Sequence, residues 1–133
     1  MRQGNLRPKA RILRTLGAEL ISSDKVALVE LVKNAYDADA SVVCVEFNGP
    51  LVAGQGAITV WDDGHAMDEA TLESAWLDIG TNIKRQRTRS VGGRRVLGEK
   101  GIGRLAASRL GQRLELVTRT ASSDIELTLN IDW

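Results

Sequence analysis

The alternation of hydrophobic and polar residues predicts an arrangement of short helices and short strands. Residues with helical periodicity and capping signals predict helices from Ser23 to about Ala38, from Asp68 to about Ile79, and at Ile102–Leu110. Leu6–Gly17 is expected to be a short basic helix or arm. Runs of β-branched and aromatic residues predict strands at Val42–Phe47, Ala57–Trp61, Arg113–Thr120 and Ile125–Ile131.

The helix after Ser23 carries the clearest local signals. Ser22 and Ser23 are favourable N-cap residues, and Asp24 places an acid in the first turn, where the helix dipole stabilises it. An apolar stripe is predicted from helical spacing at Leu28, Leu31, Val32 and Ala35. This stripe is expected to face the core of the domain.

The order of the elements predicts an α/β fold. Helices and strands are mixed, and Ala121–Asp124 joins the last two strands as a hairpin. We therefore expect a two-layer α/β sandwich, with helices on one face of a mixed, mostly antiparallel sheet. The 133 residues suit one domain, 1–133, with an N-terminal arm at 1–20. Gly80–Lys100 lacks a sustained period and is expected to be a long functional loop.

Composition narrows the functional classes. Hydrophobic residues make up 43% of the chain and aromatic residues 4%, so the core is expected to be aliphatic. The formal net charge of +1 does not indicate a polyanionic partner. Cys44 is the single cysteine, lies in an apolar run and is expected in the core, which fits a reducing, cytoplasmic location. No apolar stretch approaches the ~20 residues that span a bilayer, so no membrane association is expected.

Three polar residues share one face of the helix after Ser23. Glu30, Asn34 and Asp37 recur at helical spacing, opposite the predicted apolar stripe. Such a face is often only solvated. Asn34, however, is a poor helix former in a central position, and oxygen ligands of this kind suit Mg²⁺. The face is therefore a candidate metal and water site.

The segment Asp62-Asp63-Gly64-His65-Ala66-Met67 follows the second predicted strand. It can be an ordinary turn, or it can recognise a base. In the second case Asp62 accepts a hydrogen bond from an exocyclic amine, Gly64 admits a flat ring and Met67 contacts it. His65, the only histidine, has no nucleophilic partner and is expected to be an exposed turn residue.

The segment Gly98-Glu99-Lys100-Gly101-Ile102-Gly103 opens a predicted helix, where free N–H groups favour an anion. It matches neither the Walker A pattern nor the Rossmann fingerprint. The preceding loop carries a run of basic residues, which can be solvated surface, a phosphate-facing lid or a nucleic-acid patch. The run comprises Lys84, Arg85, Arg87, Arg89, Arg94 and Arg95.

These segments, in this order, resemble the three motifs of the GHKL superfamily of gyrase, heat-shock chaperone, histidine kinase and MutL ATP-binding domains. The stretch from Glu30 to Ala40 resembles the N-box, Asp62–Met67 the G1 box and Gly98–Gly103 the G2 box. Ile79-Gly80-Thr81, followed by Lys84, resembles the segment after the G1 box in chaperone and MORC-like branches.

The resemblance implies the Bergerat α/β sandwich, with ATP and Mg²⁺ as cofactors. It makes Glu30 the general base, Asn34 the Mg²⁺ ligand and Asp62 the acceptor of the adenine amino group. The resemblance makes residues 80–100 the ATP lid, with basic side chains that face the nucleotide at least part of the time. The other expected ATP-site residues are Asp37, Gly64, Met67, Thr81, Lys84, Gly98, Lys100, Gly101, Ile102 and Gly103.

The residue type at position 30 distinguishes branches of the superfamily, because histidine kinases usually carry Asn where this chain has Glu30. The resemblance therefore implies an ATPase that acts as a conformational switch and forms a homodimer in the full-length protein. We expect this chain alone to be weak or inactive, because relatives continue beyond the position of Trp133 with further strands and take a catalytic Lys or Arg from a following domain. A non-hydrolysing nucleotide-binding module and a nucleic-acid-binding module remain alternatives.

One residue departs from the G1 pattern. Ala66 stands where the family has its second glycine. If the backbone there had φ > 0, alanine would cost on the order of 1 kcal/mol. Its methyl group would also narrow the base pocket, so nucleotide affinity is expected to depend on the conformation of this residue.

Overall fold

The computed structural model describes residues 10–77, 88–98 and 102–133. Its α-helices are α1 (Ala10–Leu20), α2 (Asp24–Asp37), α3 (Glu69–Leu72) and α4 (Ile102–Leu110). A π-helical turn, η1 (Glu73–Leu77), continues α3 directly. The strands are β1 (Val43–Asn48), β2 (Ala57–Asp62), β3 (Arg113–Thr118) and β4 (Leu127–Asp132).

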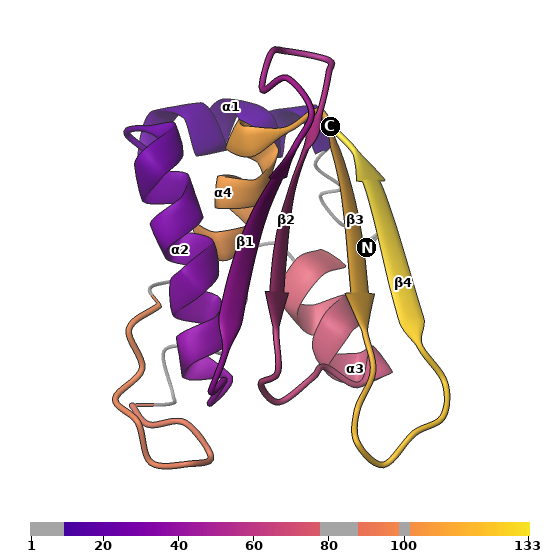
Figure 1. Cartoon of the computed structure of the whole chain (residues 1–133). Coiled ribbons are helices and arrows are strands. Elements are labelled where there is room, and N and C mark those ends of the chain that lie inside the picture. The colour runs from indigo at the N-terminus through magenta and orange to yellow at the C-terminus, as the bar shows by residue number, and fades with distance from the viewer. Residues whose placement is uncertain (1–9, 78–87, 99–101) are drawn as a thin grey trace, which may run out of the picture.

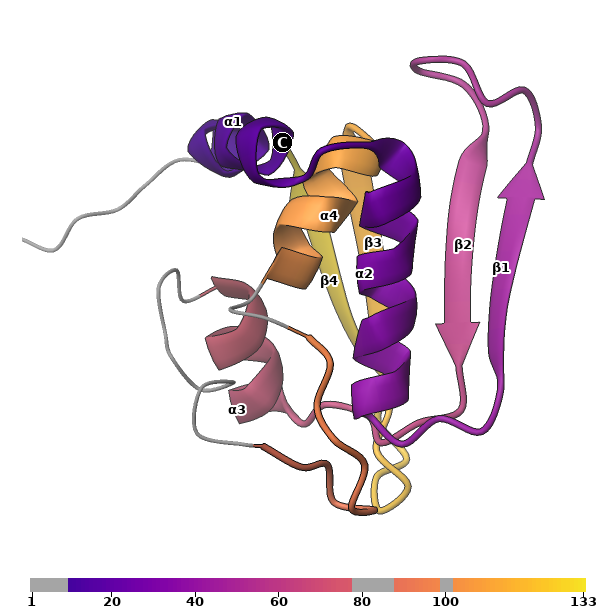
Figure 2. The ribbon, with the colours of Figure 1, turned by 90° about the vertical axis from the view of Figure 1, so that its left-hand side faces the viewer.

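The α/β class predicted from the sequence is confirmed, with the helices lying on one side of the strands (Figures 1 and 2). β1 pairs antiparallel with β2, and β3 pairs antiparallel with β4. Among the described residues these pairs form two separate sheets, so the single mixed sheet that we expected is replaced by two hairpins. Each hairpin closes through a short local connection, whereas joining β2 to β3 requires a contact across α3 and α4.

The core lies where α1, α2 and α4 meet. Ile21, Ala27, Leu105 and Ala106 form its buried cluster, and Leu31, Leu110 and Trp133 pack against it. Alanines at the α2–α4 contact allow the two helix backbones to approach closely. Figure 2 shows α4 between α1 and α2, which places the N-terminus of α4 beside the middle of α2.

The buried face of α2 differs from the stripe predicted from periodicity. Ala27 is fully buried and Ala35 is 3% exposed, whereas Val32 is 37% exposed. The close contact with α4 favours small residues on the buried face of α2. This face is therefore rotated from the predicted stripe toward Glu30 and Asn34. The polar face of α2 is consequently half-buried at its edge and is not simply solvated.

The predicted ends of the helices agree best with the structure where a capping residue defines them. Ser23 caps α2, its Oγ accepting from Val26 N at 3.2 Å, and α4 has the predicted bounds. Asp68 caps α3 through Thr71 N, but the segment then changes to the π-helical η1. The basic helix predicted at 6–17 is described from Ala10 and continues to Leu20 as α1.

The prediction for Cys44 is wrong, because its thiol is exposed. In the β1–β2 register Cys44 lies opposite Trp61, on the outer face of the hairpin. Val43 and Val45 take the inner face, since alternate residues of a strand point to opposite sides. Apolar composition of the run alone did not reveal this register.

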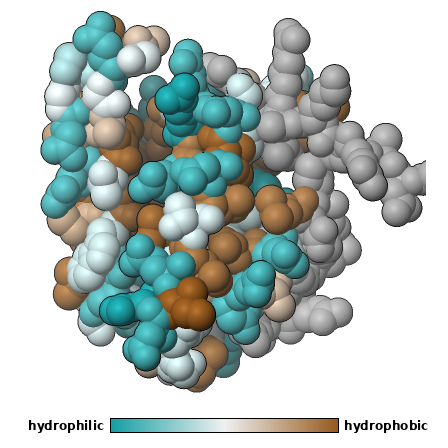
Figure 3. Space-filling model, turned by 90° about the vertical axis from the view of Figure 1, so that its right-hand side faces the viewer, coloured by the Kyte–Doolittle hydropathy of each residue, from teal (hydrophilic) through white to brown (hydrophobic). Residues whose placement is uncertain are grey.

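The surface carries several large apolar side chains. Phe47 on β1 is 52% exposed, and Ile125, just before β4, is 70% exposed. Figure 3, which views the side where β4 lies, shows apolar patches interspersed with polar surface. Within the residues that the structure describes, no helix has the length and apolarity needed to cross a bilayer.

Candidate functional site

The turn after β2 lies against the C-terminal end of α2. His65 N donates to the Ala38 carbonyl oxygen at 2.6 Å. The Asp63 carboxylate accepts hydrogen bonds from Ser41 N at 2.7 Å and from Val42 N at 2.8 Å. These bonds fix the segment that resembles the G1 box to the segment that resembles the N-box. The hydrogen bond from Val42 N, followed by that from Ser41 N, holds the pKa of Asp63 below its ordinary value.

Asp62 and Gly64 form the tip of this turn. Asp62 is exposed, and its Oδ1 accepts from Gly64 N at 2.9 Å, which leaves Oδ2 free of that bond. A Cβ at Gly64 would lie 2.7 Å from the Ala38 carbonyl oxygen, so this close approach requires glycine. Asp39 is the only non-glycine residue with positive φ in the described part of the chain, so Ala66 carries no such strain.

The ends of the segment that resembles the G2 box also lie against α2. The Asp37 carboxylate accepts from Leu97 N and from Gly98 N, each at 2.7 Å. At the other end, a Cβ built on Gly103 would overlap the amide nitrogen of Asn34. Asn34 and Asp37 are one turn apart, so a single face of α2 positions both the entry and the exit of this segment.

Glu30 lies one turn before Asn34, and its side chain is only 14% exposed. Its Oε1 lies 2.8 Å from Lys33 Nζ. Glu30 and Asn34 therefore offer a carboxylate and an amide oxygen on the same half-buried face of α2, and Asn34 lies beside the N-terminus of α4. This donor set has the hard oxygen ligands that Mg²⁺ prefers.

Residues 88–98 have a defined structure within the loop expected from the sequence. An antiparallel bridge joins Arg89 to Arg95, and Ser90 N donates to Arg94 O at 2.8 Å. Arg94 reaches back to α2: its Nη1 donates to Tyr36 O at 3.2 Å and to Ala40 O at 2.8 Å, and its guanidinium lies 4.8 Å from the Tyr36 ring centre. Arg94 therefore contacts the end of α2, and the expectation that the basic side chains of this loop face the nucleotide stays a prediction.

Asp39 connects this loop to the end of α2. Its carboxylate accepts from Ser90 Oγ and, at 2.7 Å, from Gly92 N. Arg94 Nε lies 3.9 Å and His65 Nε2 lies 3.6 Å from the same carboxylate. The Ser90 hydroxyl, followed by Gly92 N–H, holds the pKa of Asp39 below its ordinary value, so the group is ionised at neutral pH.

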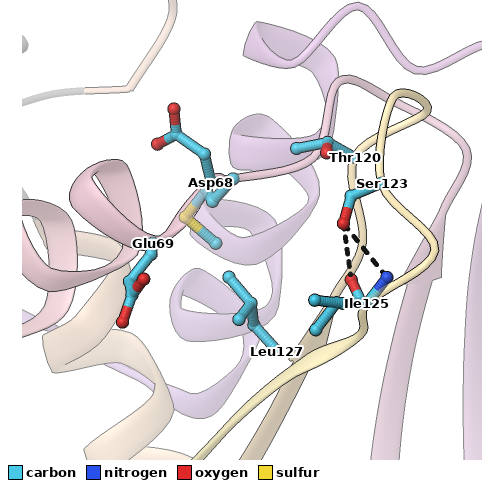
Figure 4. A pocket seen from close by; sticks show the side chains of 7 residues that line it. Asp68, Glu69, Thr120, Ser123, Ile125 and Leu127 are labelled. Carbon is cyan, nitrogen blue, oxygen red and sulfur yellow. Dashed lines mark hydrogen bonds between the residues drawn. The ribbon is translucent and has the colours of Figure 1, made fainter.

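Met67 lines a depression of about 210 Å³ between the start of α3 and the β3–β4 connection, which Figure 4 shows from close by. The backbone N–H of Met67 donates to Thr118 Oγ1 at 3.0 Å. This bond ties the turn that resembles the G1 box, Asp62–Met67 (the G1-like turn), to β3. Among the residues that we predicted for ATP binding, Met67 alone lines this depression. The lining residues are Met67, Asp68, Glu69, Thr120, Ser123, Ile125 and Leu127.

Several predicted site residues lie outside the described residues. These are Thr81, Lys84, Lys100 and Gly101, and the side chain of Ile102. Among the residues that the structure does describe, no three His, Cys, Asp or Glu side chains form a metal-binding group. A Mg²⁺ ion held by one or two protein oxygens and by phosphates does not require such a group.

Sequence reasoning missed Asp39, Asp63 and Ser90, which make the contacts between the three motif segments. Asp39 follows the last turn of α2, a position where a left-handed residue often ends a helix and where Asp is tolerated better than most residues. That position was a usable signal. The partners of Asp63 and Ser90 are 21 to 51 residues away in sequence, and no local pattern indicates them.

The fold and the site together define a class of protein. One helix carries a carboxylate and an amide on one face. A glycine-containing turn and a glycine-rich segment that opens another helix both pack against it. This is the arrangement of a nucleotide-binding α/β domain. Residues 21–133 match the model of the family described as histidine kinase-, DNA gyrase B-, and HSP90-like ATPase. The chain belongs to this family, and it is an ATP-binding ATPase module of the GHKL type.

A similar protein provides a second comparison. Over 78 residues the chain is 35% identical to the putative type II restriction enzyme HgiDII of Herpetosiphon aurantiacus. The match covers 59% of this chain and 12% of that protein. The GHKL resemblance is thus confirmed by the family match, whereas the expected position near the chaperone and MORC-like branches stays a prediction.

Proposed function

We propose that this module binds Mg²⁺-ATP and hydrolyses it as a conformational switch within a larger protein. The observation that supports this most directly is the pairing of α2 with both ends of the glycine-rich segment. Asp37 accepts from Gly98 N, and Asn34 lies against Gly103. Phosphates at the N-terminus of α4 would then lie beside the polar face of α2.

The residues take separate roles in this proposal. Asp62 accepts a hydrogen bond from the adenine amino group, and Gly64 permits close approach of the base. Asn34 supplies an oxygen to Mg²⁺, which when bound neutralises charge on the phosphates. Glu30 accepts a proton from the water that attacks the γ-phosphorus, as the bond from that phosphorus to the β,γ-bridging oxygen breaks.

The Lys33–Glu30 ion pair favours a second candidate, a module that binds ATP without hydrolysing it. With Lys33 Nζ at 2.8 Å, the Glu30 carboxylate is already occupied by a cation. A base in this position must exchange that contact for a water molecule before it can act. Binding with no turnover in the full-length protein is the outcome that this second candidate predicts.

Turnover of the Glu30→Gln variant distinguishes the two candidates. In the full-length protein, removal of the base is expected to lower ATP turnover by about 100-fold or more, with ATP affinity within about threefold of wild type. Steady-state phosphate release and calorimetry measure the two quantities. Glu115→Gln, an exposed position on β3, is the matched control. Equal turnover in wild type and Glu30→Gln would contradict the role of Glu30 as the base.

The contacts of two arginines, Arg89 and Arg94, weaken the nucleic-acid alternative for this part of the basic run. Arg94 donates to two carbonyl groups at the end of α2, and Arg89 Nη1 donates to Gly93 O at 2.9 Å. Both guanidinium groups are thereby engaged within the protein. The match to a putative restriction enzyme covers 12% of that protein, which supports a module that works among further domains.

A further inference from the structure

The C-terminal end of α2 is the place where all three motif segments meet. The G1-like turn reaches it through the bond from His65 N to Ala38 O, at 2.6 Å. Residues 88–98, which lead into the glycine-rich segment, reach it through Asp37 and Asp39. Asp37 was predicted as a site residue, whereas Asp39 has no role in the proposed chemistry.

Asp39 has a backbone conformation that is uncommon for residues with a side chain. Its φ of 61° is in the left-handed region, which residues with a side chain seldom adopt. Its side chain is only 12% exposed. Backbone conformations of this kind tend to be retained where the surrounding contacts require them, and functional sites are a frequent case.

The contacts of Asp39 account for this conformation. The carboxylate receives Ser90 Oγ and Gly92 N on its two oxygens, with Arg94 at 3.9 Å. Ser90 Oγ in turn accepts from Arg94 N at 2.9 Å, which closes the turn of the loop onto itself. A Cβ at Gly92 would lie 2.7 Å from Asp39 Oδ1, so the loop backbone fits closely around the carboxylate.

We propose that Asp39 is a positioning residue of the nucleotide site. By holding residues 90–94 against the end of α2, it fixes the path along which the chain reaches Leu97 and Gly98, and thereby sets the entry to the phosphate-binding segment. This inference rests on the proposed function, since it assigns the segment after Gly98 to the phosphates. Within the described residues, the Asp39 side chain directly contacts the turn after β2 through His65, whose ring is 64% exposed.

Two substitutions separate the side chain of Asp39 from its backbone. Asp39→Gly favours the left-handed conformation but removes every carboxylate contact. Asp39→Asn tolerates that conformation and keeps one side-chain oxygen, while losing the charge that faces Arg94 and His65. Asp132→Asn is the control, because Asp132 on β4 pairs with Arg113 and its side chain is 78% exposed.

The first readout needs no nucleotide. In Asp39→Gly, hydrogen exchange at the Gly92 amide is expected to speed up by about tenfold or more, because that N–H loses its acceptor. Asp39→Asn should fall between this variant and wild type, and Asp132→Asn should match wild type. Unchanged exchange at Gly92 in Asp39→Gly would overturn the inference.

The second readout compares ATP with adenosine by calorimetry. Asp39→Gly is expected to weaken ATP binding by about tenfold and adenosine binding by less than about twofold, because only ATP uses the phosphate segment. A general loss of structure would weaken both ligands equally, and that result would also overturn the inference. Wild-type protein that binds neither ligand would instead defeat the proposed function itself, whatever the exchange rates show.

Discussion

Asn34 is the residue whose surroundings in the structure differ most from those expected from the sequence. In the sequence it is a polar residue opposite an apolar stripe, and such a position is most often exposed to water. In the structure its amide lies against Gly103 at the start of α4. Glycine is needed at position 103 because a larger residue would occupy the space of the Asn34 side chain.

Gly103→Ala is therefore expected to displace the Asn34 side chain while leaving α4 helical. The added methyl group meets the end of a side chain and not a backbone atom, so the loss of folding stability should stay near 1 kcal/mol. Mg²⁺-dependent ATP binding should fall by about tenfold, because the metal ligand moves. Calorimetry with and without Mg²⁺ measures the effect on binding, and thermal unfolding measures the effect on stability.

Gly54→Ala is the comparison for this variant. Gly54 has φ of 79° and no atom within 4 Å of an added Cβ, so it tests backbone strain away from the site. Full Mg²⁺-dependent binding by Gly103→Ala would show that Asn34 does not hold the metal.

At the scale of elements, acidic side chains fix how the segments are joined and where they begin. Asp63 ties β2 to the residues before β1, and Asp39 ties residues 90–94 to α2, both across long stretches of sequence. Asp68 acts locally, as the cap that begins α3. Hydrogen bonds lower the pKa of all three below the ordinary value of 3.8, with the Thr71 side chain as the first cause for Asp68. Each carboxylate accepts these bonds more strongly while it is ionised.

This arrangement predicts a loss of stability in acid. Because the three folded-state pKa values are lowered, the unfolded chain binds more protons than the folded chain as the pH falls toward and below 3.8. Their contribution is complete well above that pH and disappears as the pH passes through the folded-state values. Urea unfolding measured from about pH 7 to about pH 3 should show this decline.

The same titration on Asp39→Asn gives the control. Its decline over the acidic range should be shallower than that of wild type, since one of the three lowered groups is gone. An identical slope in the two proteins would show that Asp39 does not contribute to the acid sensitivity.

The elements were predictable to the extent that their signals are local. Ser23 and Gly111 mark the limits of α2 and α4, and both helices were predicted within one residue of their ends. The buried face of α2 was not predictable, because packing against α4 selects Ala27 and leaves Val32 at the surface. Likewise, the π-helical turn that follows α3 has no sequence pattern distinct from an α-helix.

At the scale of the whole molecule, the three motifs were recognisable from the sequence, but their contacts were not. The order of the boxes indicated the family, which the match over residues 21–133 confirms. The assembly of the boxes around the end of α2 depends on long-range hydrogen bonds that the carboxylates of Asp37, Asp39 and Asp63 accept. The pairing of strands into two hairpins is likewise a long-range property, and the sequence pattern predicted one sheet instead.

The most direct test of the proposed function is a calorimetric titration of Mg²⁺-ATP into the wild-type chain and into Asp62→Asn. Asparagine keeps the oxygen that accepts from Gly64 N, but it can present an N–H group to the adenine amine where the carboxylate presents an acceptor. We expect wild type and the Asp132→Asn control to bind alike, and Asp62→Asn to bind at least about tenfold more weakly. Equal affinity of wild type and Asp62→Asn, or a wild-type chain that does not bind, would contradict the assignment of this turn as the base site.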